Sequence, residues 1–204
     1  MGYSIISLAR EFGSGGRIIG KELADRLGFK YYDRAIIQLS ATKSGLSPEY
    51  IENSENGKPS FLASLSNMST SAYVNSGLNL QYSLPVNDQA FLAQSEVIRE
   101  VAREGNCVIV GRVAGYILRG DPRLLRVLLY GDKADRLDRI VSVYGYDRKS
   151  AEVELAKVDK GRAYYHKFYT GLPRNELSQY DVVLNTTATG IDGAVNALHS
   201  LIEV

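Results

Sequence analysis

Apolar and polar positions divide this chain of 204 residues into two kinds of segment. Short, continuously apolar runs, typical of strands that are buried on both faces, occur at residues 5–9, 107–111, 124–130 and 180–186. Longer segments with apolar residues three or four positions apart lie between and after them, and this spacing is typical of amphipathic helices. The alternation predicts an α/β fold: a doubly wound parallel sheet of about five strands with helices on both faces.

Capping residues predict where the helices begin and end. The first helix follows the glycines at 13–16 and ends at Gly28, and a short strand then ends at Asp33. The last helix is predicted to start at a capping box formed by Thr189 and Asp192. Four further helices are predicted at 34–42, 88–104 with Asp88 as its cap, 133–145, and 148–169 with Asp147 as its cap.

Residues 43–87 differ in composition, because Ser and Asn are frequent and only patches such as Phe61–Met68 have helical spacing. We interpret 43–87 as a small, mobile helical insert that binds the acceptor, within a single domain spanning 1–204. In a parallel sheet, ligands bind at the carboxyl ends of the strands. The polar segments that fall at those ends are Arg10 to Arg17, Asp33, Gly111-Arg112 and Gly131-Asp132.

Charge and cysteine content exclude several classes of protein. With 24 Lys and Arg against 23 Asp and Glu, the formal charge of +1 indicates neither a nucleic-acid partner nor a membrane partner. Cys107, the only cysteine, lies in an apolar strand, so we expect neither disulfides nor thiolate metal clusters. We expect a reducing, cytoplasmic location. We expect no leader peptide and no membrane span. The charge and cysteine content leave open whether the protein is a monomer or a homodimer.

The segment between the first strand and the first helix carries three glycines within four residues. A phosphate at a helix N-terminus needs backbone N–H groups that side chains do not cover, and glycines provide them. The predicted phosphate-binding residues are Arg10, Gly13, Ser14, Gly15, Gly16 and Arg17. The alternative is that the glycines only permit a tight turn between a strand and a helix.

The glycine segment departs from the usual phosphate-loop signature. The Lys and Ser/Thr that should open the helix are replaced by Gly16 and Arg17, and Gly20-Lys21 lies too far inside the helix to serve as the match. We assign the missing positive charge mainly to Arg17, with Lys21 in a supporting role. A dinucleotide-binding reading fails because Ile18 stands where the third glycine is needed. The sequence also lacks zinc-ligand spacing and a hydrolase nucleophile elbow.

Three longer stretches resemble the nucleoside monophosphate kinases of the P-loop class, and most closely the cytidylate kinase-like family. They are ELADRLGFKYYDRAI (22–36), the segment from VIVGRVAGYILRGD to ADRLDRI (108–140), and YDVVLNTTATGIDGAVNALHSLI (180–202). The resemblance covers about 3–40 and 95–203 and fails in the insert. It implies a P-loop NTPase-type kinase fold with a helical lid at 145–170, inside which Gly161 marks a bend.

The resemblance also implies a reaction and a set of site residues. ATP, as its Mg²⁺ complex, would give its γ-phosphoryl group to a small acceptor such as the nucleoside monophosphate CMP. The implied catalytic cations are Arg112, Lys160 and Arg162, beside Arg17 and Lys21, and the implied acceptor-binding residues are Asp33, Arg112 and Asp159. No metal ligand is assigned.

Each assignment has a structural alternative. Arg112 could form an ion pair at the sheet edge, and Asp33 could cap the next helix. Arg136 and Arg139, three positions apart on a helix, are interpreted as a solvated face, and Tyr164, Tyr165 and Tyr169 as ordinary packing. His166 has no evident partner in the sequence and is not expected to be a catalytic base.

Two departures from the family pattern leave two other functions open. Gly16 replaces the loop lysine, which permits a nucleotide-binding regulatory protein with little or no turnover. Val113 replaces the Asp that follows the family's Gly-Arg, which puts cytidine specificity in doubt. Together with the unfamiliar insert, this permits a small-molecule kinase with a non-nucleotide acceptor.

Overall fold

The chain forms one parallel sheet with helices on both faces. The computed structural model describes residues 2–56 and 86–202. The strands are β1 (Ile5–Arg10), β2 (Lys30–Tyr32), β3 (Cys107–Val110), β4 (Leu124–Tyr130) and β5 (Val182–Asn185). Their order is β2-β3-β1-β4-β5, and every neighbouring pair is parallel. The predicted doubly wound sheet is therefore confirmed, with β1 at its centre.

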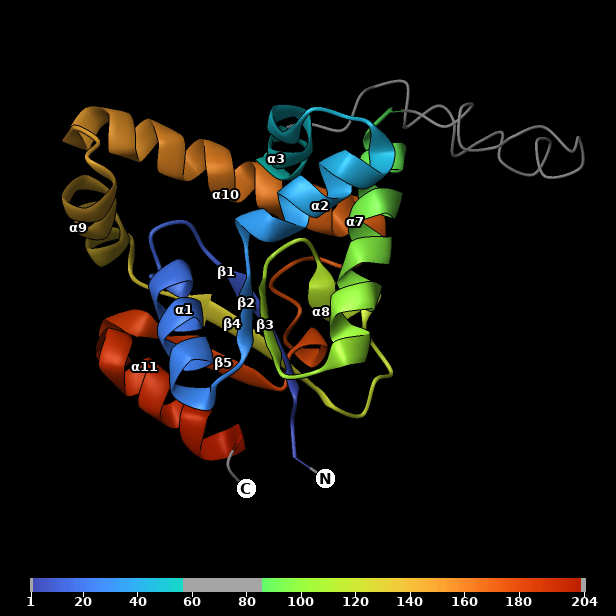
Figure 1. Cartoon of the computed structure of the whole chain (residues 1–204). Coiled ribbons are helices and arrows are strands. Elements are labelled where there is room, and N and C mark those ends of the chain that lie inside the picture. The colour runs from blue at the N-terminus through green and yellow to red at the C-terminus, as the bar shows by residue number, and fades with distance from the viewer. Residues whose placement is uncertain (1, 57–85, 203–204) are drawn as a thin grey trace, which may run out of the picture.

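Two apolar layers hold the helices against the sheet. Alternate residues of β1 point to opposite faces, so Ile6 and Leu8 pack against α1 (Gly16–Leu27) and α11 (Thr186–Ile202). Ile5 packs on the other face against α7 (Val86–Glu104) and the short α8 (Ala114–Ile117). Figure 1 shows these two layers on either side of the strands.

A second group of helices lies over the carboxyl ends of the strands. It consists of α2 (Arg34–Ser44), α3 (Pro48–Asn56), α9 (Lys133–Tyr144) and α10 (Arg148–Thr170). Helix α10 crosses the top of the molecule in Figure 1, from α9 toward α3. Buried Ile51 of α3 packs with α2 and α7, and Ile140 and Leu155 join α9 to α10 beside Phe12. The edge of the sheet where ligands are expected is therefore enclosed by helices.

Several predicted boundaries differ from the structure. The last strand is Val182–Asn185, shorter than predicted, and α11 begins directly after it at Thr186. The capping box is wrong, because the Thr189 hydroxyl donates to the carbonyls of Asn185 and Gly190, and the non-helical residue is Gly190 itself. Asp88 lies inside the first turn of α7, where its carboxylate accepts from the Tyr169 hydroxyl at 3.2 Å.

Two predicted helix ends agree with the structure. Gly28 ends α1 in the left-handed conformation, and the Asp147 carboxylate caps α10 by accepting from the backbone N–H of Ser150. Within the predicted insert, 43–87, residues 48–56 form α3, and residues 57–85 lie outside the described residues. Helix α10 runs through Gly161 without a break. In the described part of the chain, no helix has the length and apolar character needed to cross a membrane.

Candidate active site

The glycine loop joins β1 to α1 at the carboxyl end of the central strand. Gly13 and Gly15 have positive φ angles of 79° and 82°, which disfavour a side chain. Close packing gives a second reason for these glycines: a Cβ atom on Gly13 would lie 2.5 Å from the carbonyl oxygen of Arg136, and one on Gly16 would lie 2.7 Å from Cβ of Arg10. In the part of the chain that the structure describes, no side chain caps the N-terminus of α1. The first backbone N–H groups of a helix have no partner within it, so this terminus is suited to an anion.

Two arginines of α9 fix the shape of the loop. Arg136 Nη1 donates to the carbonyl of Phe12 at 3.2 Å, and Arg139 Nη1 donates to the carbonyl of Gly13 at 2.6 Å. The expectation of a solvated face is therefore wrong for this pair: Arg136 is buried, and both guanidinium groups point at the loop. The prediction failed because the carbonyls of Phe12 and Gly13 face α9 and accept hydrogen bonds from the two arginines, which the sequence of α9 does not reveal.

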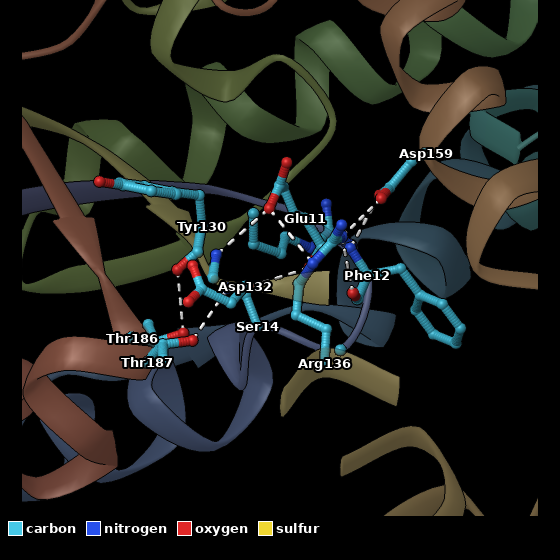
Figure 2. Close-up of polar contacts among 12 residues, drawn as sticks. Glu11, Phe12, Ser14, Tyr130, Asp132, Arg136, Asp159, Thr186 and Thr187 are labelled. Atoms are coloured by element: carbon cyan, nitrogen blue, oxygen red, sulfur yellow. Dashed lines mark hydrogen bonds and ion pairs between the residues drawn. The ribbon is translucent and has the colours of Figure 1, made fainter. Parts of the chain in front are cut away.

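Arg136 is also the centre of an acidic cluster, shown in Figure 2. The carboxylate of Asp159, on α10, accepts from Arg136 Nη1 at 2.6 Å and from the Phe12 backbone N–H at 2.9 Å. Glu11 lies 3.4 Å from Arg136 Nε and accepts from the N–H of Gly131 at 3.2 Å. Asp159, predicted to bind the acceptor, is thus placed against the loop, where it joins α10 to the loop and to α9.

The two cations predicted to replace the loop lysine point in different directions. Arg17 Nε lies 2.8 Å from Asp33 Oδ2, at the end of β2. Lys21 pairs with Asp25, one turn further along α1, on an exposed surface away from the loop. Asp33 stands at the N-cap position of α2 but makes no capping hydrogen bond with its side chain. The structure therefore brings Arg17 and Asp33 together and leaves Lys21 outside the site.

A cavity of about 330 Å³ lies beside the carboxyl ends of β1 and β3. Its lining contains arginine side chains from five separate parts of the chain and, among the described residues, no Asp, Glu or Lys. The arginines are Arg10, Arg112, Arg119, Arg126, Arg162 and Arg174. Arg126 is already neutralised, because Asp181 binds its guanidinium through both carboxylate oxygens. A cavity lined in this way favours an anionic ligand.

Arg10 connects this cavity to the glycine loop. Its side chain, only 6% exposed, lies on Gly111, where an added Cβ atom would stand 1.7 Å from Nη1. Its carbonyl accepts hydrogen bonds from Arg162, at 3.2 Å, and from Arg174. The predicted residues Arg10, Arg112 and Arg162 are thus brought together, and Arg174 joins them.

The turn after β3 is strained. Gly111, Arg112 and Val113 all have positive φ angles, and a β-branched residue rarely adopts one. The turn directs the Arg112 side chain into the interior, where Nη1 donates to the carbonyl of Ile51 at 3.0 Å and the residue is 4% exposed. Strain of this kind is found at ligand sites, where it holds a group in place.

The remaining wall of the cavity comes from α10 and the segment after it. His166 Nε2 and Gln179 Oε1 are 2.8 Å apart, so this histidine has a partner that the sequence does not reveal. Burial lowers the pKa of His166 below its usual value. Tyr165 and Tyr169 pack with Phe91, as predicted, and Tyr165 also lines the cavity. Lys160 is exposed on α10 and is not part of the lining.

Sequence reasoning missed Arg119, Arg126 and Arg174 as lining residues. The last of them lies beyond α10 in a segment without periodic pattern, and nothing local indicates that it reaches Arg10. A partial signal was available in the small residues Ser7 and Ala9 in an otherwise large, apolar strand. Both line the cavity, and small side chains on one face of a central strand leave room for a ligand.

The side chains near the loop do not fit a magnesium ion held by the protein. The described residues contain no cluster of three His, Cys, Asp or Glu that could hold a metal. Arg17 occupies the place of the usual hydroxyl ligand, and Asp33 is paired with it. Ser14 has a hydroxyl close to the loop, but it is buried and donates to the carbonyl of Glu11. A magnesium ion would therefore depend on phosphate oxygens and water.

The sheet order, the glycine loop at the end of β1 and the enclosing helices define a P-loop kinase type of fold. The sequence model of the cytidylate kinase-like family matches residues 5–188, and the chain belongs to that family. It is 30% identical over 105 residues to the cytidylate kinase of Pyrococcus horikoshii, covering 51% of this chain and 53% of that protein. It is 26% identical over 113 residues to the cytidylate kinase of Methanopyrus kandleri, covering 52% and 58%. The aligned part spans little more than half the length of these curated relatives.

Solved structures agree on the fold. An uncharacterised protein from Eubacterium ventriosum superposes with a TM-score of 0.70 at 24% identity, covering 98% of both chains. A shikimate kinase from Bacteroides thetaiotaomicron superposes with a TM-score of 0.55 at 14% identity, also covering 98% of both chains. At such identities the likeness concerns the fold alone.

Proposed function

We propose that the protein transfers the γ-phosphoryl group of ATP to a small anionic acceptor, with a nucleoside monophosphate such as CMP as the first candidate. One observation carries the proposal: an open helix N-terminus and a cavity rich in arginine meet at Arg10. The first suits the phosphates of a donor, and the second suits an acceptor that carries negative charge. Two relatives of this chain are named cytidylate kinases, which also supports CMP as the first candidate acceptor.

The chemistry asks the protein to position two phosphate groups and to neutralise charge. An acceptor oxygen would attack the γ-phosphorus while the bond from that phosphorus to the β–γ bridging oxygen breaks and ADP leaves. The backbone N–H groups at the start of α1 would hold the donor phosphates, and Arg17 would meet the transferred group from the helix side. Arg10, Arg112, Arg162 and Arg174 would orient the acceptor from the cavity. Magnesium would come bound to the nucleotide.

There are two alternative functions, and one observation supports each of them. Gly16, in the place of the loop lysine, favours a regulatory protein that binds nucleotide with little turnover. Val113 stands where the family has an Asp, and the described residues that line the cavity include no Asp or Glu. The amino group of cytosine would therefore find no carboxylate acceptor there, which favours a kinase with a non-nucleotide acceptor. For each of these functions, as for the main proposal, a cytoplasmic location is the expectation.

A turnover screen separates the three functions. Purified protein is incubated with ATP and magnesium, and with each nucleoside monophosphate or common anionic metabolite in turn, and phosphorylated products are identified by mass spectrometry. Phosphorylated CMP or another nucleotide supports the main proposal, and phosphorylation of only a metabolite supports the non-nucleotide kinase. Tight ADP binding with no product supports the regulatory protein. Arg162→Met should abolish product, whereas Arg148→Met, which removes an exposed cation paired with Asp138, should not.

A further inference from the structure

We infer that Asp33 is a positioning residue that holds the guanidinium group of Arg17 at the mouth of the phosphate loop. The inference rests on the proposed function, in which Arg17 supplies the charge of the missing lysine. Its basis is the contact between Arg17 Nε and Asp33 Oδ2 at 2.8 Å. The Asp33 side chain is only 11% exposed and the Arg17 side chain is 39% exposed, so the carboxylate is the fixed member of the pair.

The backbone places both residues for this role. Arg17 is the second residue of α1, and because side chains on a helix lean toward its N-terminus, we expect its guanidinium on the side of the loop. Asp33 follows β2, whose carboxyl end lies at the same edge of the sheet as the loop. Asp33 stands where a helix cap is expected, yet its side chain makes no capping hydrogen bond. Its carboxylate is instead directed at Arg17.

The contact with Asp33 leaves the two terminal nitrogens of the Arg17 guanidinium group available to bind phosphate. Nε makes the ion pair, so the four N–H bonds of the two terminal nitrogens are not consumed by it. A free arginine side chain loses rotamer entropy when it is fixed on a phosphate, and a partner that already holds the side chain reduces that loss. The same partner has an opposite effect on charge, because a carboxylate beside the site repels phosphate.

These two effects predict a split between binding and turnover. Removing the Asp33 charge should leave ADP affinity unchanged or tighten it, because repulsion falls. It should lower kcat, because Arg17 is no longer held where the phosphoryl group separates. A residue that only stabilised the fold would not produce opposite effects on these two constants.

The test measures kcat, acceptor KM and ADP dissociation constants for Asp33→Asn, with Asp25→Asn as the matched control. Asp25 forms the corresponding carboxylate pair with Lys21 on the same helix, but it lies at an exposed surface away from the loop. We expect Asp33→Asn to lower kcat by about 10-fold with acceptor KM unchanged, and Asp33→Glu to recover part of the loss. Asp25→Asn should have no effect.

A double-mutant cycle decides whether Asp33 acts through Arg17. Arg17→Ala alone should lower kcat by on the order of 10². Adding Asp33→Asn should then lower it little further, because the group to be positioned is gone. Losses that multiply, or a rise in acceptor KM with kcat unchanged, would mean that Asp33 acts on the acceptor directly and would overturn the inference.

The inference can fail separately from the proposed function. If wild-type protein shows no turnover with any acceptor, the proposed function fails, and the same cycle is measured on binding of ADP and a non-hydrolysable ATP analogue. Asp33→Asn and Arg17→Ala should then each reduce the preference for the triphosphate, without adding. If Arg17→Ala changes neither turnover nor this preference while wild-type protein remains active, the inference fails and the phosphotransferase stands.

Discussion

The two halves of the candidate site are built in different ways. The phosphate loop is one continuous segment, 10–17, held by carbonyl contacts to Arg136 and Arg139 of α9. The arginines of the cavity come from separate parts of the chain: β1, the turn after β3, the segment after α8, β4, α10 and the segment after α10. The loop depends on local backbone geometry, whereas the cavity depends on the whole fold. Changes to the two halves should therefore affect different constants.

The largest effect is expected where the halves meet. Arg10→Met removes a buried guanidinium group from the cavity and should lower turnover by on the order of 10³, because in phosphoryl transfer the positioning of the acceptor is one of the largest contributions that the protein makes. Nucleotide affinity should fall far less, since the loop backbone is unchanged. Steady-state kinetics and ADP titration give the two values. Arg26→Met is the control, because Arg26 pairs with Glu22 on the exposed surface of α1.

A glycine pair tests how Arg10 is held in place. Ala at Gly111 would stand 1.7 Å from Arg10 Nη1, so Gly111→Ala should displace that side chain and lower turnover by about 10². Gly28→Ala introduces similar backbone strain, at φ +67°, with nothing within 4 Å of the new Cβ atom. Thermal unfolding should show about 1–2 kcal/mol of strain in both variants. Equal turnover in the two would contradict the placement of Arg10.

The α9 arginines test the donor side alone. Arg139→Met removes the donor to the Gly13 carbonyl and should weaken ADP binding by about 10-fold, the scale of one lost charge-assisted hydrogen bond. Acceptor KM should stay within experimental error, because Arg139 does not line the cavity. Calorimetry with ADP provides the first value and initial rates provide the second. A shift in acceptor KM as large as the shift in ADP affinity would show that the two halves are not separate.

The smallest effect concerns the cavity wall. Burial lowers the pKa of His166, so the folded protein takes up this proton at lower pH than the unfolded chain does. The contribution of His166 to stability should be complete above the usual pKa of about 6.5 and should fall as the pH drops below it. NMR titration of the imidazole should show the low pKa, and His166→Gln should reduce the loss of stability below pH 6.5. An unshifted titration in the folded protein would contradict this.

The sequence was sufficient for the fold and for the loop, for physical reasons. Continuous apolar runs such as 107–110 belong to strands covered on both faces, and three glycines between a strand and a helix leave few other structures possible. Helix starts were less predictable, as at Thr186, where α11 follows β5 with no turn between them. The capping pattern at Thr189 was misleading, because its hydroxyl donates back to the carbonyl of Asn185 and the chain departs from helical geometry at Gly190.

The cavity could be predicted only in part. Arg10 and Arg112 follow strands at their carboxyl ends, so the fold rule for ligand sites finds them. Arg174 and the partner of Arg136 could not be found, because residues more than 20 positions apart in sequence meet only after the chain has folded. The direction of Lys21 was likewise undetermined by sequence, since an i to i+4 pair with Asp25 and a contact with the loop are both open to a lysine on α1.

The most direct test of the account is to follow the γ-phosphoryl group itself. ATP labelled with ¹⁸O on its γ-phosphate is incubated with the protein and with the acceptor found by the turnover screen, and mass spectrometry locates the label. The account predicts labelled acceptor in an amount equal to the ADP formed, and loss of both in Arg10→Met. Label found only in inorganic phosphate, or ATP left intact with every acceptor tested, would contradict a site in which the loop delivers phosphate to the arginine cavity.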